Sequence, residues 1–227
     1  MKIRDYIILS VASLCIGYVV AMNSTTTEVV NDPDSTVIDT TIIRDTTVNV
    51  AGKTALFIGD SHTANHTNGW QIQVSKAVGF KMINASVGGK TTYWMINQAV
   101  YQVNDNIDYC FVYGGANDMY SHISPQAAVE NIKGIARICR EHNTKCIVLT
   151  GFDPVKCTKT SNPNYAKKYA MFQRLLLTED MDGAIIVDTR VVERTDCWDG
   201  LCHMSPSGHA KVAKKVIEDL KFKKVSK

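Results

Sequence analysis

Four segments of this 227-residue chain carry polar groups that together could transfer an acyl group. A serine stands in "GDSHT" at Ser61, and a histidine stands in "CHMSPSGH" at His203. "NASVGGKTT" offers a backbone donor at Gly89, and "GGAND" offers a side-chain amide at Asn117. A nucleophile, a base that takes its proton and donors for the oxyanion are what such a transfer requires. The four segments therefore predict an acyl-transfer site, provided that the fold brings them together.

The segment "NASVGGKTT" also looks like the end of a nucleotide-binding loop, because Lys90 and Thr91 follow its glycine pair. A phosphate-binding loop needs another glycine five residues before Gly89, where this sequence has Asn84. A position where backbone N–H approaches a developing oxyanion without an intervening side chain explains Gly89 better. The cysteine spacing in "CWDGLCH" fits no common zinc pattern either. We therefore expect neither a nucleotide cofactor nor a metal.

The elements that must position these groups alternate along the chain. Short apolar runs predict strands at residues 54–58, 81–85, 109–113, 145–150 and 184–188. Helical spacing of apolar residues, with Ser-Pro caps before two of the helices, predicts helices at 69–79, 91–103, 126–142, 165–178 and 206–220. This alternation predicts a three-layer α/β/α sandwich with a central parallel, roughly five-stranded sheet of flavodoxin-like type. In such sheets the functional residues gather at the carboxyl ends of the strands.

These blocks, taken in order, resemble those of the SGNH (GDSL-type) hydrolases over residues 54–220. The resemblance implies the SGNH hydrolase fold, Ser61 as the nucleophile and His203 as the base. It also implies that the N–H groups of Ser61 and Gly89 and the side-chain amide of Asn117 form the oxyanion hole. The expected activity is that of a serine esterase, which hydrolyses carboxylic esters through an acyl-enzyme and needs no cofactor.

The acid of the triad departs from the family pattern. The family usually has Asp three residues before the catalytic histidine, where this chain has Gly200, whereas Asp199 lies four residues before it. We expect Asp199 to orient the imidazole, helped by a loop that a Cys197–Cys202 disulfide would bridge. Asp196, a backbone carbonyl or a Ser–His dyad without an acid remain alternatives, because the role depends on geometry rather than on spacing.

Other polar and aromatic residues surround these blocks. Trp198, beside the expected acid, is a candidate substrate contact. His62 is a second candidate, with a solvated loop histidine as the alternative. Asp60 and Asp118 are expected to bind local backbone and hold their loops. His209 is expected to lie on the surface of the last helix.

The N-terminus indicates export. Two basic residues precede an uncharged apolar run at residues 6–22, so residues 1–22 are a signal peptide or an N-terminal membrane anchor that could tether the protein. Residues 23–53 are rich in Thr, Val and Asp and are expected to form a linker or stalk. Residues 54–227 then form the hydrolase domain, in an extracytoplasmic location, whether secreted, periplasmic or membrane-anchored.

Net charge and cysteine content bear on the binding partners and on disulfide formation. The formal net charge of +3 is too small to indicate a nucleic-acid partner. Six of the seven cysteines lie outside the apolar leader, which permits disulfides in an oxidising compartment without determining their pairing. Cys110, inside an apolar run, is expected to be a buried thiol.

Export and an esterase site together predict a small-molecule or polysaccharide ester as substrate. The simplest expectation is deacetylation of O-acetylated carbohydrate or cell-wall polymer. A lysophospholipase or thioesterase that acts on lipids is an alternative that the family resemblance also allows. A carbohydrate-binding module that keeps the fold without turnover is another, because the acid is displaced by one residue.

Overall fold

The five predicted strands form one parallel sheet in the computed structural model, which describes residues 46–64, 67–157, 164–198 and 203–226. The strands lie in the order β2-β1-β3-β4-β5. Their bounds are β1 Thr54–Gly59, β2 Lys81–Asn84, β3 Tyr109–Tyr113, β4 Lys145–Leu149 and β5 Ile185–Val187. The predicted α/β sandwich with a parallel, five-stranded sheet is therefore confirmed.

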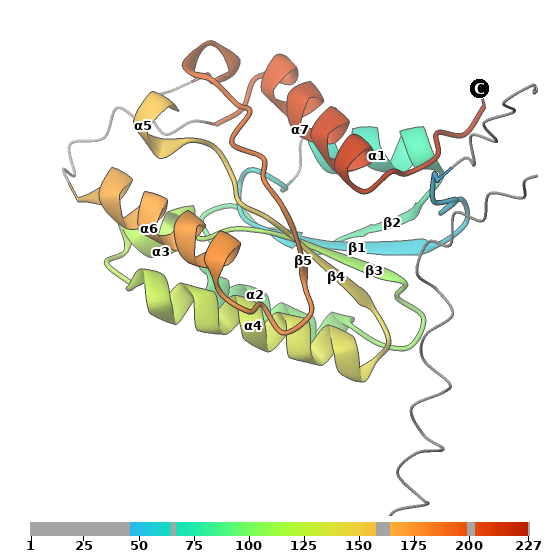
Figure 1. The fold of residues 1–227 in the computed structure, drawn as a ribbon, viewed down its shortest axis with the longest axis horizontal. Helices are drawn as coiled ribbons and strands as arrows, with labels where there is room; N and C mark the ends of the chain where they lie inside the picture. The colour runs from blue at the N-terminus through green and yellow to red at the C-terminus, as the bar shows by residue number, and fades with distance from the viewer. Residues whose placement is uncertain (1–45, 65–66, 158–163, 199–202, 227) are drawn as a thin grey trace, which may run out of the picture. The chain divides into compact units, whose positions relative to one another are not determined.

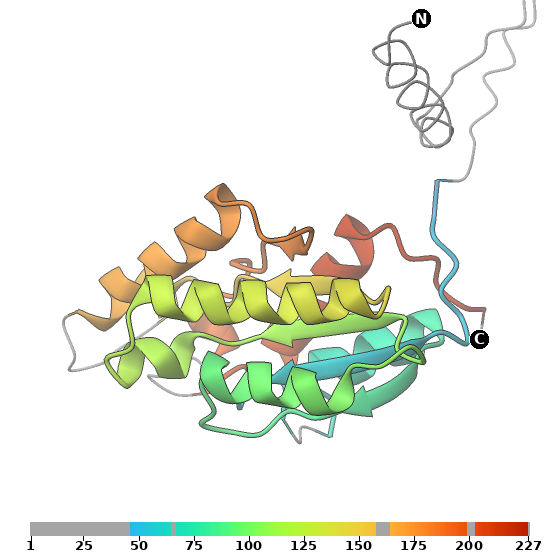
Figure 2. The same cartoon turned by 90° about the horizontal axis from the view of Figure 1, so that it is seen from below.

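Helices cover both faces of this sheet (Figure 1). One face carries α1 and α7, which pack against each other, and the other carries α2, α4 and α6 side by side with the short α3. Figure 2 shows the second face from below. The bounds are α1 Trp70–Val78, α2 Thr92–Gln102, α3 Ala116–Tyr120, α4 Pro125–Glu141, α5 Pro154–Cys157, α6 Tyr165–Thr178 and α7 Pro206–Asp219. A short 3-10 helix, η1, spans Arg194–Asp196.

The central strands are apolar along their whole length because helices cover both of their faces. Residues 55–58 of β1 and 110–113 of β3 have no exposed surface. The edge strand β2 differs, since all four of its side chains are exposed. The apolar runs therefore predicted β1 and β3, two of the three inner strands, correctly, and Cys110, on β3, is the buried thiol that was expected.

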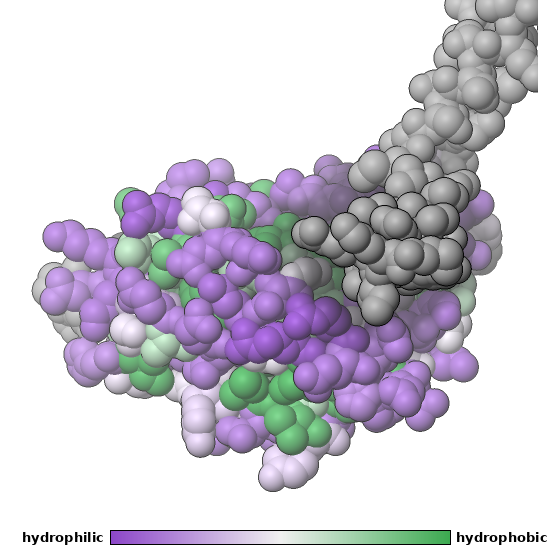
Figure 3. Space-filling model, turned by 60° about the horizontal axis from the view of Figure 1, so that its bottom comes forward, coloured by the Kyte–Doolittle hydropathy of each residue, from purple (hydrophilic) through white to green (hydrophobic). Residues whose placement is uncertain are grey.

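The longest helix, α4, shows how the sequence pattern places the core. Its buried side chains recur every three or four residues, which is the period of a single helix face. They are Ala128, Val129, Ile132, Ile135, Ala136 and Cys139. Figure 3 views the side of the molecule that carries α2 and α4, where mostly hydrophilic surface surrounds small apolar areas. The helices thus bury one face each against the sheet and leave the other to solvent.

The two predicted Ser-Pro caps have different outcomes. Ser124 accepts a hydrogen bond from the Ala127 N–H at 3.1 Å, with Pro125 in the first turn of α4, as predicted. At α7, Ser205 occupies the N-cap position but its hydroxyl makes no capping bond. The Ser205 hydroxyl instead bonds the Ser207 hydroxyl at 2.9 Å. The predicted side-chain cap of α7 is therefore wrong, although its position is right.

The packed domain begins earlier than Thr54. Val50 is 1% exposed and belongs to the core, and Val48 forms a parallel bridge with Phe222. The predicted linker at residues 23–53 is therefore too long at its carboxyl end, because backbone pairing with the C-terminal tail holds residues 48–50 in place. The expected leader at 1–22 and the linker up to residue 45 lie outside the described residues. No helix among the residues that the structure describes is long and apolar enough to cross a membrane.

Candidate active site

The candidate residues meet at the carboxyl edge of the sheet because the strand register places three strand ends side by side. Phe57 of β1 pairs with Asn84 of β2, and Gly59 pairs with Tyr113 of β3. The loops that follow β1, β2 and β3 therefore leave the sheet at the same edge. This edge is where a doubly wound sheet collects functional groups.

Ser61 and His203 lie within hydrogen-bonding distance. The Ser61 Oγ and the His203 Nε2 are 3.0 Å apart, although 142 residues separate them in the sequence. Both side chains are partly exposed, so a substrate can reach them. A hydroxyl in contact with an imidazole nitrogen is the arrangement in which the ring can remove the hydroxyl proton.

Backbone pairing holds His203 in place before α7. The Trp198 N–H donates to the His203 carbonyl at 2.7 Å, and the Ser205 N–H donates to the Asp196 carbonyl at 2.7 Å. Cys197 and Met204 form an antiparallel bridge between these two bonds. The imidazole is therefore carried on a short paired segment rather than on a free loop.

The glycine pair after β2 lies against the serine. A Cβ added to Gly88 would lie 3.7 Å from the Ser61 Cβ, so the two loops are in contact. Gly89 has a φ of +75°, a left-handed conformation that favours glycine. A Cβ added to Gly89 would meet no protein atom within 4 Å. The backbone of Gly89 therefore borders open space, and the preceding residue, Gly88, is the one that lies against the serine.

The Asn117 amide lies between the loops that follow β1 and β2. Its Nδ2 donates to the Asp60 Oδ2 at 3.2 Å and to the Lys90 carbonyl at 3.1 Å. Asp60 precedes the serine, and Lys90 follows Gly89. The structure thus places a side-chain amide nitrogen among the same loops as the hydroxyl, the imidazole and the glycine pair.

Asp60 and Asp118 reach further than the local backbone contacts expected of them. Asp60 does accept from the nearby His62 N–H at 2.9 Å, but it also binds Asn117 from another strand end. Asp118 accepts from the backbone N–H and the hydroxyl of Thr92, at the start of α2. Both carboxyl groups are fully buried. The sequence gives no direct signal of these contacts, because each joins residues of different loops.

Burial controls the protonation of Asp60. It raises the pKa of Asp60 to about 7, while the hydrogen bond from the His62 N–H opposes the rise. The neighbouring Asp118 carboxylate raises the pKa further, and His203 lowers it. A buried carboxyl group with this pKa therefore lies directly beside the candidate nucleophile.

Two histidines differ from their expected environments. His62 is 3% exposed, so the alternative of a solvated loop histidine is wrong. Its ring packs against Tyr113 and Phe152, with its centroid 5.5 Å from that of His203. His209, expected on the surface, is also buried and accepts from the Trp70 N–H at 3.3 Å. Both errors arise because neighbouring elements cover positions that are polar in the sequence.

The acid of the triad is only partly resolved by the structure. Asp199 and Cys202 lie outside the described residues, and with them the predicted Cys197–Cys202 pair. Asp196 is described, and its carboxylate accepts from the Lys211 Nζ, the Ser207 hydroxyl and the Glu193 N–H. Burial alone would raise the pKa of Asp196, but these three bonds lower it below its usual value.

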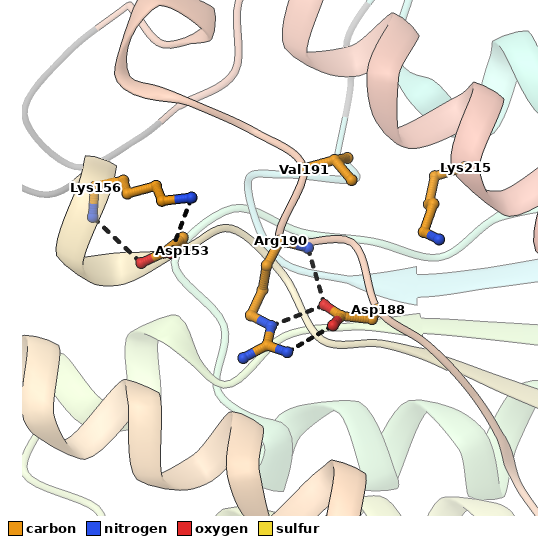
Figure 4. Close-up of a pocket in the computed structure, with 6 residues that line it drawn as sticks. All are labelled: Asp153, Lys156, Asp188, Arg190, Val191 and Lys215. Carbon is orange, nitrogen blue, oxygen red and sulfur yellow. Dashed lines mark hydrogen bonds and ion pairs between the residues drawn. The ribbon is translucent and has the colours of Figure 1, made fainter.

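A hollow of about 350 Å³ lies at the ends of β4 and β5 (Figure 4). Each of its cations faces a carboxylate: Arg190 pairs with Asp188 at 2.6 Å, Lys156 with Asp153 at 3.8 Å, and Lys215 with Asp219 at 2.9 Å. This charge balance disfavours a strong anion site. Over the described parts of the chain, no three His, Cys, Asp or Glu side chains gather as a metal site would require.

Trp198, the other candidate substrate contact, is 71% exposed. The Trp198 backbone pairs with that of His203, so the exposed ring belongs to the same short segment as the imidazole. An exposed indole in this position has surface available for a ligand.

Several solved structures share this fold. Axe2, an acetylxylan esterase from Geobacillus stearothermophilus, is similar with a TM-score of 0.62 and 14% identity, covering 78% of this chain and 98% of Axe2. TesA is similar with a TM-score of 0.61 and 17% identity, covering 74% of this chain and 98% of TesA. A G-D-S-L-family protein from Desulfitobacterium hafniense DCB-2 is similar with a TM-score of 0.61 and 13% identity, covering 74% and 99%. At these identities the likeness shows the fold.

The sequence itself shows the family. No curated protein sequence matches the chain significantly. Residues 57–211, however, match the GDSL-like Lipase/Acylhydrolase family, and this span contains Ser61, Gly89, Asn117 and His203. The chain therefore belongs to the GDSL-like lipase/acylhydrolase family and is an SGNH-type hydrolase of carboxylic esters.

Proposed function

We propose that Ser61 attacks the carbonyl carbon of an ester while His203 removes the proton of its hydroxyl. The single observation that carries this proposal is the 3.0 Å contact between the Ser61 Oγ and the His203 Nε2. His203 then gives that proton to the departing alcohol, and the acyl group stays on Ser61. In the second step His203 takes a proton from water, the water oxygen attacks the acyl-enzyme, and Ser61 recovers its proton.

The negative oxygen of each tetrahedral intermediate is held by three donors in this proposal. They are the N–H groups of Ser61 and Gly89 and the side-chain amide of Asn117. The open space beside Gly89 and the position of Asn117 among the same loops support the assignment. One such donor contributes about 3 kcal/mol to transition-state stabilisation, which corresponds to roughly two orders of magnitude in turnover.

Asp199 orients the imidazole in this mechanism. Asp196, the principal alternative, already accepts three hydrogen bonds that tie η1 to α7. Its carboxylate therefore has a structural task that leaves it poorly suited to bind the imidazole. Replacing Asp199 by Ala is expected to lower kcat strongly, whereas replacing Asp196 is expected mainly to lower the melting temperature.

The substrate we propose is O-acetylated carbohydrate or cell-wall polymer outside the cytoplasm. The apolar run at residues 6–22 supports export, and the fold is shared with an acetylxylan esterase. The hollow at the ends of β4 and β5 lies at the same sheet edge as Ser61 and is lined mainly by charged side chains. Such a surface suits a hydroxyl-rich substrate better than an acyl chain. Trp198 is the proposed substrate contact, whereas the ring of His62 is buried against Tyr113 and Phe152 and leaves almost no surface for a ligand.

The first experiment compares the purified protein with its Ser61→Ala and His203→Ala variants on p-nitrophenyl acetate, butyrate and octanoate. We expect Ser61-dependent turnover that is fastest on the acetate, and fluorophosphonate labelling of the wild type but not of Ser61→Ala. Equal rates for the wild type and Ser61→Ala would refute the esterase proposal. Faster cleavage of the octanoate would favour the lipid-directed alternative.

The second experiment addresses substrate and location. Release of acetate from acetylated xylo-oligosaccharide is measured beside release of fatty acid from a lysophospholipid. N-terminal sequencing of the exported protein then distinguishes a cleaved signal peptide from a retained anchor at residues 1–22. Protein found only in the cytoplasm, with its first residues intact, would contradict the proposed location.

A further inference from the structure

The oxyanion donor proposed at Asn117 works in only one orientation. A side-chain amide carries a nitrogen donor and an oxygen acceptor at nearly identical positions, and a half-turn about the last torsion exchanges them. Only the nitrogen can stabilise a negative oxygen, since the amide oxygen would repel it. Something in the site must therefore determine which atom faces the substrate.

The neighbours of the Asn117 nitrogen are both acceptors. The Asp60 Oδ2 lies at 3.2 Å and the Lys90 carbonyl oxygen at 3.1 Å. A flipped amide would place its oxygen against these two oxygens and would lose both hydrogen bonds. Asp60 cannot turn away to relieve this, because its other oxygen accepts from the His62 N–H at 2.9 Å.

From these contacts we propose that Asp60 is a positioning residue, which holds the Asn117 amide with its nitrogen toward the oxyanion site. The inference rests on the esterase mechanism proposed above. Asp60 does for the amide what the acid of a triad does for its imidazole, since each selects one of two orientations. Asp60 acts through Asn117 and does not itself contact the substrate.

The resting contacts also indicate how the donor becomes available. The Asn117 nitrogen has two hydrogens, one held by Asp60 and one by Lys90. Above its raised pKa of about 7, Asp60 is ionised, and a hydrogen bond to such a charged acceptor is about twice as strong as one to a neutral carbonyl. The developing oxyanion therefore takes the hydrogen that the Lys90 carbonyl holds, while the bond to Asp60 continues to orient the amide.

The burial of Asp60 argues against a purely structural tie. The side chain is fully buried, and burying a carboxylate is costly unless hydrogen bonds compensate. An acid nonetheless occupies this position, where it can accept from His62 and Asn117 at the same time. An asparagine could accept from only one of them and would turn its NH₂ group toward the other.

The test is a double-mutant cycle with Asp60→Asn and Asn117→Ala, measured on p-nitrophenyl acetate. We expect Asp60→Asn to lower kcat at least tenfold, by no more than the loss in Asn117→Ala, with KM within threefold of wild type. The double variant should lie within threefold of Asn117→Ala, because Asp60 has nothing left to orient. Asp108→Asn is the matched control and should leave kcat unchanged, because Asp108 also accepts from a backbone N–H and a side chain, those of Thr54 and Lys53, but lies at the amino edge of the sheet, away from Ser61.

The outcomes separate the inference from the function on which it rests. If the wild type lacks Ser61-dependent activity, the proposed function and the inference both fail. If the wild type is active but the two losses multiply in the double variant, or Asp60→Asn keeps kcat within twofold, only the inference is overturned. Melting temperatures establish that each variant is folded. Asp60→Ser, which is smaller and keeps an acceptor for His62, goes through the same cycle if the asparagine variant does not fold.

Discussion

Replacing Gly89 by alanine tests the oxyanion hole with a perturbation whose size follows from the structure. The backbone φ of +75° costs a residue with a Cβ about 1 kcal/mol, and the added Cβ meets no protein atom within 4 Å. The loss of unfolding free energy should therefore be about 1 kcal/mol, or roughly 2–4 °C in melting temperature for a domain of this size. In the proposed oxyanion hole, however, the methyl group would enter the open space that the ester carbonyl is expected to occupy. We expect kcat/KM to fall at least tenfold.

Gly183 supplies the matched control. Its φ is +84°, and a Cβ there also meets nothing within 4 Å, but it lies in the turn before β5. Gly183→Ala should lose about the same unfolding free energy and keep the kcat/KM of the wild type. Stability is measured by urea unfolding and activity on p-nitrophenyl acetate, in parallel for both variants. If Gly89→Ala keeps wild-type kcat/KM at a similar loss of stability, Gly89 does not face the reacting carbonyl.

Three further predictions follow from burial and exposure. Because the pKa of Asp60 is raised from 3.8 to about 7, the native state holds a proton that the unfolded chain loses between these two pH values, so the free energy of unfolding falls as the pH rises from 4 to 7. Urea unfolding should show the wild type losing up to about 4 kcal/mol relative to Asp60→Asn over this range, and the same pH dependence of unfolding free energy in both proteins would contradict this. Trp198→Ala should change the unfolding free energy by less than about 0.5 kcal/mol, because the ring is 71% exposed, while raising KM for an acetylated oligosaccharide; an unchanged KM would remove Trp198 as a substrate contact. Cys110, Cys139 and Cys146 are buried, so a thiol reagent should modify them only after unfolding, whereas Cys197 is partly exposed; rapid native-state labelling of any of the three buried thiols, located by peptide mass spectrometry, would refute their placement.

The strands and the motif positions could be predicted from local patterns. Residues 54–58 and 109–113 are continuous apolar runs that end at glycines, and both became central strands. The motifs that contain Ser61 and Asn117 directly follow these runs, so their place at the carboxyl edge followed from the topology of a parallel sheet. The resemblance of four short blocks to one family was confirmed over residues 57–211.

Burial of individual polar residues could not be predicted in this way. His62 and His209 both stand in polar segments, yet packing from other parts of the chain covers them. Ser205 has the sequence context of a helix cap, but its hydroxyl bonds Ser207 instead. The start of the domain was misplaced for the same reason, because Val48 is held by pairing with Phe222 at the other end of the chain.

The sequence by itself determined the order in which strands and helices follow one another along the chain, the protein family and the residue types available for catalysis. These depend on spacing and side-chain chemistry within short segments. Only the tertiary structure decided that Ser61 and His203 meet at 3.0 Å and that Asp60 binds an amide 57 residues away. Such contacts arise when strands from distant parts of the chain pair in register and loops pack over their ends, and no local pattern records that geometry.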